Sequence, residues 1–392
     1  MEKVILRNQA AGRIKKGYPM IVKQDYATPP QSKEGDLVEL TDQKGQFLAI
    51  AYLGKEKRSS GWVVSTQKDQ KLDGTFMKKI FEQAKENRKS YFLDEDTNAF
   101  RLFNGEGDGL GGMIIDFYNG FALFQWYNKG IYAHRQTILK SFHDVFPMVK
   151  GIYEKKRFPT KGQASSDFVT GEKAPSPLIV KENNIRYATY LDDGLLTGIF
   201  LDQRQVRRSI MENYAAGSTV LNLFSYTGAF SVAAAMGGAT KTVSVDVAKR
   251  SLPKTTEQFE VNGLNSEDHE IRIMDVFDYV NYALRHELTF NLVISDPPTF
   301  ARTKKRTFSV EKDYEELIEQ YIDLTTENGV IVLSTNSWTL SMKEFKQIIN
   351  RAFTKKNQSY TILEKHGLPT DFAVKEDYLE GEYLKVVFVQ KK

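Results

Sequence analysis

Cysteine is absent from all 392 residues of the chain. Its absence excludes disulfides, thiolate metal ligands and cysteine nucleophiles. Histidine is scarce as well: the chain has five, and they show no metal-ligand spacing. We therefore predict that the protein requires no metal. Any mechanism that depends on an enzyme thiolate is closed to this chain.

Long hydrophobic runs are also missing. No segment approaches the roughly 20 apolar residues that are needed to cross a bilayer, and residues 1–7 lack the apolar core of a signal peptide. We therefore expect a protein that is neither embedded in a membrane nor secreted, and that resides in the cytoplasm.

The chain has little excess charge, because its formal net charge is only +4. Such a charge is too small to indicate a polyanionic partner by itself, so the distribution of the basic residues matters more. Each basic cluster alone is typical of a solvated surface. Two clusters are candidates for RNA contacts, namely Arg13, Lys15 and Lys16 near the N-terminus, and Arg302, Lys304, Lys305 and Arg306 in the C-terminal half.

The length exceeds what one hydrophobic core usually supports, which favours several domains. Residues 1–70 have short strand patterns separated by turns, including a hairpin loop at residues 42–45. A helix is expected at about residues 75–89, within a central α+β domain over residues 71–175. From residue 176 to residue 392, strands alternate with helices, which predicts a doubly wound parallel sheet.

Residues 104–112 contain five glycines and could suggest a phosphate-binding loop. The run lacks the Lys-Ser/Thr ending of such loops, and it precedes a strand rather than a helix. We interpret it as a turn.

The first strand of the C-terminal region, at residues 218–224, leads through residues 225–228 into a helix at residues 229–236. Nucleotides bind at this turn in doubly wound folds. The turn has a single glycine, Gly228, instead of the G-x-G-x-x-G that brings the backbone close to a pyrophosphate, which disfavours NAD.

The next two strands also end on acidic residues. Asp246 is placed to accept both hydroxyls of an adenosine ribose, and Asp275, Val276 and Phe277 are suited to the amino group and face of adenine. Each acid could instead cap a helix. Because they follow successive strands, together they favour an adenosine site.

The fourth strand ends in Asp296-Pro297-Pro298-Thr299-Phe300. Two prolines could merely end the strand, since proline cannot continue a hydrogen-bonded ladder. However, Asp-Pro-Pro followed by an aromatic residue is the motif that amino-directed methyltransferases use. The carboxylate and the rigid carbonyls face the target, and the aromatic ring stacks on an extruded base.

The chain resembles a known family over nearly its whole length. Residues 12–19, 101–110, 197–204, 222–228 and 296–300 are similar to motifs of bacterial large-subunit ribosomal RNA methyltransferases. The resemblance implies an α/β fold, in which a small β-barrel PUA domain (1–70) and a small α+β domain (71–175) precede a Rossmann-like catalytic domain (176–392). It also implies S-adenosylmethionine as the cofactor and 23S ribosomal RNA, or a precursor of the large subunit, as the partner. Whether the protein forms a homodimer is left open by the resemblance.

The strand-end motifs and the resemblance together give the candidate site residues. The expected catalytic residues are Asp296, Pro297, Phe300 and Asn336. The expected cofactor-binding residues are Gln203, Arg204, Asn222, Phe224, Thr227, Gly228, Asp246, Asp275, Val276, Phe277 and Asp296. Among these, the roles of Gln203 and Arg204 at the methionine end of the cofactor rest on the resemblance alone.

The missing cysteine bears on the target atom. The best-known members methylate carbon 5 of cytosine, a poor nucleophile that is activated by adding a thiolate to carbon 6. Their cysteine lies in a Ser-Cys-Ser-like strand end, where this chain has Asn336 or its neighbour. Another branch, which methylates nitrogen 7 of guanine, is similar in having Asp-Pro-Pro-Thr-Phe and an asparagine at that strand end.

Nitrogen 7 has an in-plane lone pair, so its methylation needs only correct approach in a site that excludes water. We therefore predict a ring nitrogen of guanine as the target. The alternatives are cytosine carbon 5, a catalytically inactive RNA-binding protein, and a small-molecule methyltransferase. Retention of Asp246, Asp275 and Asp296 argues against inactivity, and a small-molecule enzyme would lack salt-dependent RNA affinity.

Overall fold

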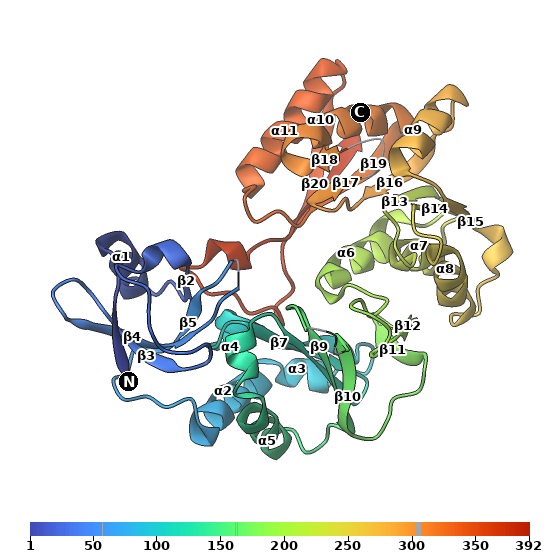
Figure 1. The fold of residues 1–392 in the computed structure, drawn as a ribbon. Helices are drawn as coiled ribbons and strands as arrows, with labels where there is room; N and C mark the ends of the chain where they lie inside the picture. The colour runs from blue at the N-terminus through green and yellow to red at the C-terminus, as the bar shows by residue number, and fades with distance from the viewer. Residues whose placement is uncertain (57, 161, 163, 303–306) are drawn as a thin grey trace. The chain divides into compact units, whose positions relative to one another are not determined.

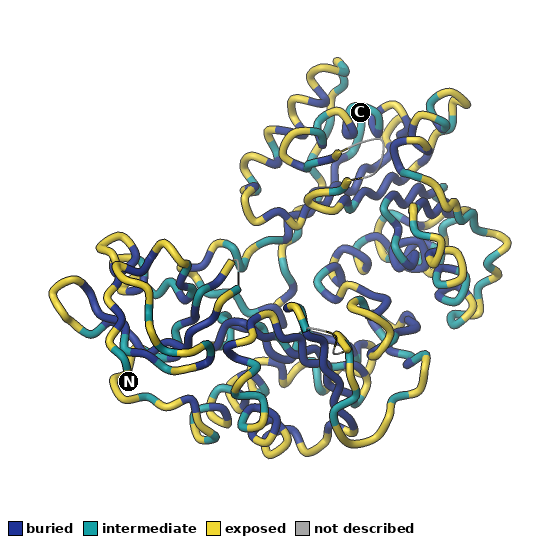
Figure 2. The backbone as a smooth tube through the Cα atoms, in the orientation of Figure 1, coloured by how far each residue is buried: buried dark blue, intermediate teal, exposed yellow. Residues whose placement is uncertain are grey.

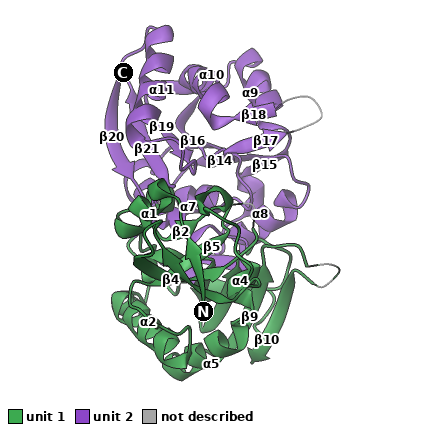
Figure 3. Ribbon diagram, turned by 60° about the vertical axis from the view of Figure 1, so that its left-hand side comes forward, with its two compact units in different colours: residues 1–180, 190–197, 370–381 green, residues 181–189, 198–369, 382–392 purple. Residues whose placement is uncertain are grey.

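The computed structural model describes residues 1–56, 58–160, 162, 164–302 and 307–392 (Figure 1). Backbone contacts divide the chain into two compact units, coloured green and purple in Figure 3. Each unit has buried apolar residues of its own. Unit 1 consists of Met1–Val180, Tyr190–Thr197 and Thr370–Gly381, and unit 2 of Lys181–Thr189, Gly198–Pro369 and Glu382–Lys392.

The N-terminal part of unit 1 is a five-stranded sheet in the order β1-β3-β4-β5-β2. Helix α1 (Asn8–Lys15) buries Ala10, Ala11 and Ile14 in the core of this sheet. The turn expected at residues 42–45 joins β3 to β4, where Asp42 Oδ1 accepts the N–H groups of Lys44 and Gln46 at 3.0 Å. The strands are β1 (Glu2–Ile5), β2 (Met20–Ile21), β3 (Leu37–Thr41), β4 (Phe47–Leu53) and β5 (Gly61–Ser65).

A second sheet of unit 1 has the order β10-β9-β8-β7-β6. The helix expected at residues 75–89 is α2 (Gly74–Asn87), which Asp73 caps by accepting the Phe76 N–H at 3.1 Å. Phe81 of α2 packs edge to face on Phe142 of α5 (Arg135–Val145). The strands are β6 (Ala99–Phe103), β7 (Met113–Tyr118), β8 (Phe121–Trp126), β9 (Gly151–Lys156) and β10 (Ser166–Gly171), and the short helices are α3 (Lys89–Phe92) and α4 (Lys129–Tyr132).

The glycine run at residues 104–112 forms the short helix η2 (Gly105–Asp108) and a turn into β7, in agreement with its interpretation as a turn. Glycine is required at position 111 by a close approach, because a Cβ there would lie 2.1 Å from Cε3 of Trp62. Tyr52 holds the same residue by donating to the Gly111 carbonyl at 2.8 Å. The run therefore serves packing within unit 1.

Unit 2 contains the doubly wound sheet that the strand-helix alternation predicts. The order is β15-β14-β13-β16-β19-β21-β20, in which β13 pairs in parallel with β14 and β16, whereas β21 is antiparallel to β19 and β20. The strands are β13 (Thr219–Leu223), β14 (Lys241–Asp246), β15 (Glu270–Ile273), β16 (Phe290–Ser295), β19 (Thr325–Thr335), β20 (Tyr360–His366) and β21 (Lys385–Lys391).

Helices cover both faces of this sheet, so its central strands are buried (dark blue in Figure 2). On one face, Leu221 and Leu223 share a core with α9 (Val276–Arg285), α10 (Val310–Leu324) and α11 (Met342–Lys355). On the other face, Val220 packs with α6 (Arg204–Ser209) and α7 (Ala229–Met236). Further elements include β11 (Leu178–Glu182), β12 (Ile185–Thr189), η3 (Leu201–Gln203), the π-helix η4 (Ile210–Tyr214), α8 (Ser251–Glu260), β17 (Phe300–Arg302) and β18 (Thr307–Ser309).

The segment Thr370–Gly381, which connects β20 to β21, packs within unit 1. Arg88, which forms a buried ion pair with Asp108, also donates to the Asp371 carbonyl at 2.6 Å. Asp371 Oδ2 accepts the N–H of Arg101 at 2.8 Å, and the ring of Tyr378 contacts Trp62 edge to face. The chain therefore leaves unit 2 after β20 and returns to it as β21.

The predicted domains at 1–70, 71–175 and 176–392 do not coincide fully with the two units. Three stretches of the predicted third domain have their contacts in unit 1, namely residues 176–180, Tyr190–Thr197 and Thr370–Gly381. The division between the first two domains remains a prediction. Among the described residues, no helix combines the length and the apolar character that a membrane span requires.

Candidate active site

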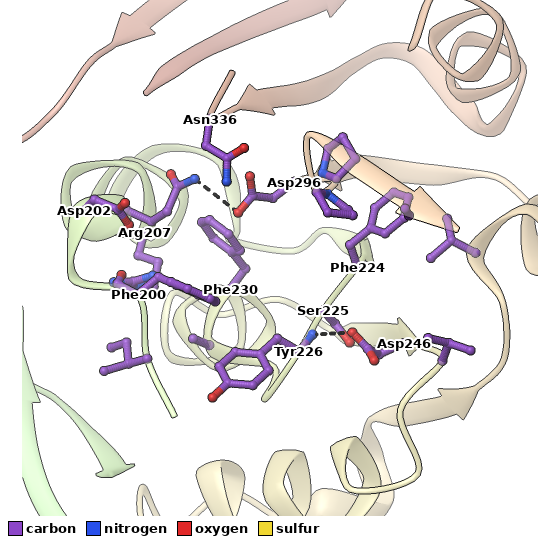
Figure 4. A pocket seen from close by; sticks show the side chains of 18 of the residues that line it. Phe200, Asp202, Arg207, Phe224, Ser225, Tyr226, Phe230, Asp246, Asp296 and Asn336 are labelled. Carbon is purple, nitrogen blue, oxygen red and sulfur yellow. Dashed lines mark hydrogen bonds between the residues drawn. The ribbon is translucent and has the colours of Figure 1, made fainter. Parts of the chain in front are cut away.

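A cavity of about 340 Å³ opens in unit 2 at the carboxyl ends of β13, β14, β16 and β19 (Figure 4). Asp296 and Asn336 lie near one another in this view, on the opposite side from Tyr226 and Asp246. Nine residues predicted from the sequence line the cavity: Gln203, Phe224, Asp246, Asp275, Val276, Phe277, Asp296, Pro297 and Asn336.

The loop after β13 has an uncommon backbone conformation. Phe224, Tyr226 and Gly228 have φ values of 58°, 53° and 76°, and such left-handed conformations cost free energy in residues other than glycine. Side chains hold the loop in place, because Thr227 Oγ1 donates to the Gly198 carbonyl at 2.6 Å and the Gly198 N–H donates to the Tyr226 hydroxyl at 3.0 Å. Non-glycine residues in these conformations are enriched at functional sites.

Asp246 connects this loop to the end of β14. Its Oδ2 accepts the Tyr226 N–H at 2.9 Å, and its Oδ1 accepts the Ala248 N–H at 2.8 Å. A carboxylate oxygen can accept more than one hydrogen bond. Asp246 can therefore hold the loop and still accept donors from a ligand in the cavity.

Asp275 begins α9 as its N-cap, where Oδ1 accepts the Phe277 N–H at 3.0 Å. The helix-cap alternative considered for this acid is therefore present in the structure, and the residue lines the cavity as well. Phe224, Phe277 and Ala301 make the adjoining wall apolar. This end of the cavity suits a flat aromatic ring that carries a hydrogen-bond donor.

Asp296 lies in a polar network behind the cavity. Gln203 Nε2 donates to Asp296 Oδ2 at 3.2 Å and to Ser334 Oγ at 2.9 Å. Burial, together with the charge of Asp202, raises the pKa of Asp296 to about 6, although Ser334, Gln203 and Arg207 favour the ionised form. The carboxyl group therefore titrates close to neutral pH.

The same glutamine carries an acceptor whose hydrogen-bonding capacity is unused within the described residues. Gln203 is only 3% exposed, and its Oε1 has no hydrogen-bond partner. The Asp296 carboxylate fixes the orientation of the amide, since turning it over would place Oε1 against Oδ2. A buried acceptor without a partner costs about 1–3 kcal/mol, and a donor from a ligand would remove this cost.

Several cavity residues were missed at the level of sequence. Phe200, Asp202 and Arg207 come from the segment before β13, and Leu384 directly precedes β21. Arg207 follows Gln203 by four residues, which is the spacing of one helix face and is the signal that could have found it. It is buried in a bidentate ion pair with Glu182, at 2.6 and 2.8 Å.

Five predicted residues do not line the cavity: Arg204, Asn222, Thr227, Gly228 and Phe300. Asn222 lies on the face of β13 that packs on α7, where its Nδ2 donates to Ser231 Oγ at 2.9 Å. Gly228 is required because a Cβ would lie 2.4 Å from Cγ2 of Thr255. Arg204 is buried at the start of α6, whereas Phe300 is 60% exposed at the start of β17.

The predicted RNA-contacting residues are placed differently from one another. Arg13 is paired with Asp25 at 2.6 Å and Lys15 with Asp42 at 3.0 Å, while Lys16 is exposed. Arg302 is exposed at the end of β17. The predictions for Lys304, Lys305 and Arg306 fall outside the described residues.

Comparison with known proteins identifies the family. A model described as S-adenosylmethionine-dependent methyltransferase matches residues 148–375, and a PUA-like domain model matches residues 4–66. The chain is 51% identical over 396 aligned residues to YwbD of Bacillus subtilis (strain 168), which is provisionally named a ribosomal RNA large subunit methyltransferase; the alignment covers 100% of both chains. Ribosomal RNA large subunit methyltransferase I of Yersinia pestis bv. Antiqua (strain Angola) is 29% identical over 90% of this chain and 89% of the relative.

Solved structures agree with this result. SMU.776, a provisionally named methyltransferase complexed with SAH, is 44% identical over 100% of both chains, with a TM-score of 0.92. A methyltransferase from Agrobacterium tumefaciens shares the fold at 15% identity and a TM-score of 0.55, over 76% of this chain and 91% of that chain. The protein is an enzyme whose cofactor is S-adenosylmethionine. The chain thus belongs to the S-adenosylmethionine-dependent methyltransferase family and carries a PUA-like domain at residues 4–66.

Proposed function

We propose that the protein methylates nitrogen 7 of a guanine in the RNA of the large ribosomal subunit. The names of its relatives support the substrate class, since both YwbD and the Yersinia protein are named for large-subunit ribosomal RNA. The observation that carries the choice of atom is the combination of Asp296-Pro297-Pro298 at the cavity with the complete lack of cysteine.

The cavity has the chemistry that the cofactor requires. Asp246 would hold the ribose hydroxyls, and the apolar wall of Phe224, Val276 and Phe277 would take the adenine ring beside Asp275. The unpartnered Oε1 of Gln203 suits the ammonium group at the methionine end. When it is bound, S-adenosylmethionine supplies an electrophilic methyl group on its sulfonium.

The residues at the end of β19 argue against carbon 5 of cytosine. Asn336 occupies the position at which a thiol would be needed, and its Oδ1 accepts a hydrogen bond from Thr299 Oγ1. The adjacent hydroxyls are engaged as well, because Ser334 Oγ accepts from Gln203 and Thr335 Oγ1 accepts from the Ser337 N–H. An in-plane nitrogen lone pair needs none of these groups as a nucleophile.

The remaining residues would position the target base. The ionised Asp296 carboxylate accepts N–H groups from the amino edge of guanine, together with the Pro297 carbonyl. Two consecutive prolines restrict the backbone at this point, which keeps both acceptors in place. Phe300 stacks on the extruded base, and Arg302 attracts the phosphate backbone.

The test is nucleoside mass spectrometry of large-subunit RNA from a strain that lacks the gene. We expect one 7-methylguanine to disappear and to return with the wild-type gene or with Asp323→Asn, which alters a surface ion pair with Lys356. Asp296→Ala should fail to restore it. Loss of a 5-methylcytosine instead would overturn the proposed target, and an unchanged set of methylated nucleosides would overturn the proposed substrate.

Transcripts made with 7-deazaguanosine in place of guanosine provide a second test with purified protein. The analogue has carbon at position 7 and therefore has no lone pair to methylate. We expect methyl transfer to ordinary transcripts and none to the analogue, whereas equal transfer to both would exclude nitrogen 7.

Another substrate class predicts a different result. A small-molecule methyltransferase would have RNA affinity that is absent or unaffected by salt, whereas phosphate contacts make affinity fall steeply as salt rises.

A further inference from the structure

Trp338 differs from the other two tryptophans of the chain. Trp62 and Trp126 are 7% and 0% exposed, whereas Trp338 is 48% exposed. It lies two residues beyond Asn336, which lines the cavity, in the segment that connects β19 to α11. A large aromatic side chain is therefore presented to solvent close to the candidate active site.

The connecting segment is firmly held, so the exposure of Trp338 does not come from a loosely bonded loop. The buried Lys385 donates from Nζ to the Ser337 carbonyl at 3.0 Å. Thr339 Oγ1 donates to Glu311 at the start of α10, and Leu340 is buried. The residues on both sides of Trp338 are thus fixed by hydrogen bonds.

A second exposed ring lies on the neighbouring segment. Phe300 is 60% exposed and follows Thr299, whose hydroxyl donates to Asn336 Oδ1. This hydrogen bond joins the segment after β16 to the segment after β19 at the rim of the cavity. Phe300 and Trp338 therefore lie on two bonded segments that both border the site.

Exposed charges of both signs accompany the two rings. Arg302 follows Phe300 by two residues and Lys343 is in the first turn of α11, while Glu344 is in the same turn and Glu311 accepts from Thr339. An apolar protein partner would favour a continuous apolar patch, whereas separate exposed rings with cations within reach are groups that bind single-stranded nucleic acid by stacking and phosphate contact.

We propose that Phe300 and Trp338 form a stacking platform for unpaired RNA, in which Trp338 receives the nucleotide next to the target base. The proposal rests on the proposed function and adds a contact outside the cavity. Stacking on a neighbouring nucleotide would help to hold the target strand open, because the extruded base loses its own stacking in the helix. Trp338 is a positioning residue here, since it need not touch the reacting atoms.

The test uses the full-length protein, transcripts of large-subunit RNA, and intrinsic fluorescence. Trp338 is the exposed tryptophan of the described chain, so RNA binding should quench its emission in the wild type and much less in Trp338→Phe. In methyl-transfer assays, Trp338→Ala should raise KM for RNA about 10-fold, as expected for the loss of one stacked base. The Kd for S-adenosylmethionine and kcat should stay within about 2-fold of the wild type, and Trp338→Phe should recover most of the affinity.

Leu363→Ala, which removes an exposed apolar side chain from β20, is the control and should leave KM unchanged. If Trp338→Ala methylates RNA with the KM of the wild type, the platform is wrong while the proposed function stands. Equal weakening of RNA and S-adenosylmethionine binding would also overturn it, because that pattern indicates a general structural role. Absence of RNA methylation by the wild type would overturn both proposals.

Discussion

The hydroxyl of Tyr383 donates to Oδ2 of Asp202 at 2.8 Å, which joins the chain just before β21 to the wall of the cavity. Asp202 precedes Gln203, and its charge acts on the Asp296 carboxyl group. Residues 181 positions apart in the sequence are thus combined in one site.

Tyr383→Phe tests the importance of this hydrogen bond. Without the hydroxyl, Asp202 loses a donor that fixes its position beside Gln203, and we expect the affinity for S-adenosylmethionine to fall about 3- to 10-fold. Calorimetry measures the change. Tyr214→Phe is the matched control, because it removes a comparable bond to Glu364, which does not line the cavity; a similar loss in both variants would contradict the expectation.

Asp246→Asn tests the ribose acceptor while it preserves the size of the side chain. The amide has one oxygen where the carboxylate has two. It can therefore accept only one of the N–H groups of Tyr226 and Ala248 in the present geometry, and it offers one acceptor fewer to the ligand. We expect cofactor affinity to fall about 10- to 100-fold. Asp323→Asn should bind normally, and normal binding by Asp246→Asn would remove this residue from the cofactor site.

The pKa of Asp296, raised to about 6 mainly by burial, predicts a pH dependence of catalysis. If the ionised carboxylate holds the base, kcat/KM should fall below about pH 6. Asp202→Asn removes a nearby negative charge, which lowers the pKa of Asp296 and should move this acidic limb to lower pH. A pH profile of methyl transfer measures both effects, and an unmoved limb in Asp202→Asn would exclude Asp296 as its source.

The same group predicts a change in stability, because its pKa is higher in the folded protein than the ordinary 3.8. The folded state binds the proton more tightly, so this contribution to stability is present below about pH 4 and is lost as the pH rises through about 6. Asp296→Asn cannot ionise. The difference in Tm between this variant and the wild type should therefore favour the variant more at about pH 8 than at about pH 4. The opposite order would contradict the raised pKa.

Gly228→Ala tests the close approach at the start of α7. Its Cβ would lie 2.4 Å from Cγ2 of Thr255 in a backbone with φ of 76°, so strain and overlap both destabilise the variant, by about 2–4 kcal/mol. Gly263→Ala is the matched control, since its φ is 70° and nothing lies within 4 Å of the added Cβ. Urea unfolding should show a smaller loss in the free energy of unfolding for Gly263→Ala. Equal losses in the two variants would mean that backbone strain, and not the overlap with Thr255, accounts for the destabilisation.

The sequence predicted the parts of the site that follow local rules. Asp246 ends one parallel strand, and Asp275 and Asp296 follow within two residues of the ends of two others. The carboxyl ends of such strands meet at one edge. Their positions could therefore be inferred without knowing the packing. By contrast, no local sequence pattern indicates that β21 pairs antiparallel with β19 and β20, which brings Leu384 to the cavity.

The direction of side chains was harder to predict. Asn222 lies near the end of β13, but the alternation along a strand turns it toward Ser231 rather than into the cavity. The pairs Arg13–Asp25 and Lys15–Asp42 were not predicted because their partners are 12 and 27 residues away. Such pairings depend on the tertiary fold, which composition and spacing do not contain.

The passage of Thr370–Gly381 through unit 1 has a consequence for synthesis. During translation the first 180 residues emerge without the segment that carries Asp371 and Tyr378. Arg88 and Trp62 can therefore make their contacts with this segment only after strands β13 to β20 have been synthesised. Unit 1 therefore cannot reach its final form before nearly all of unit 2 has left the ribosome.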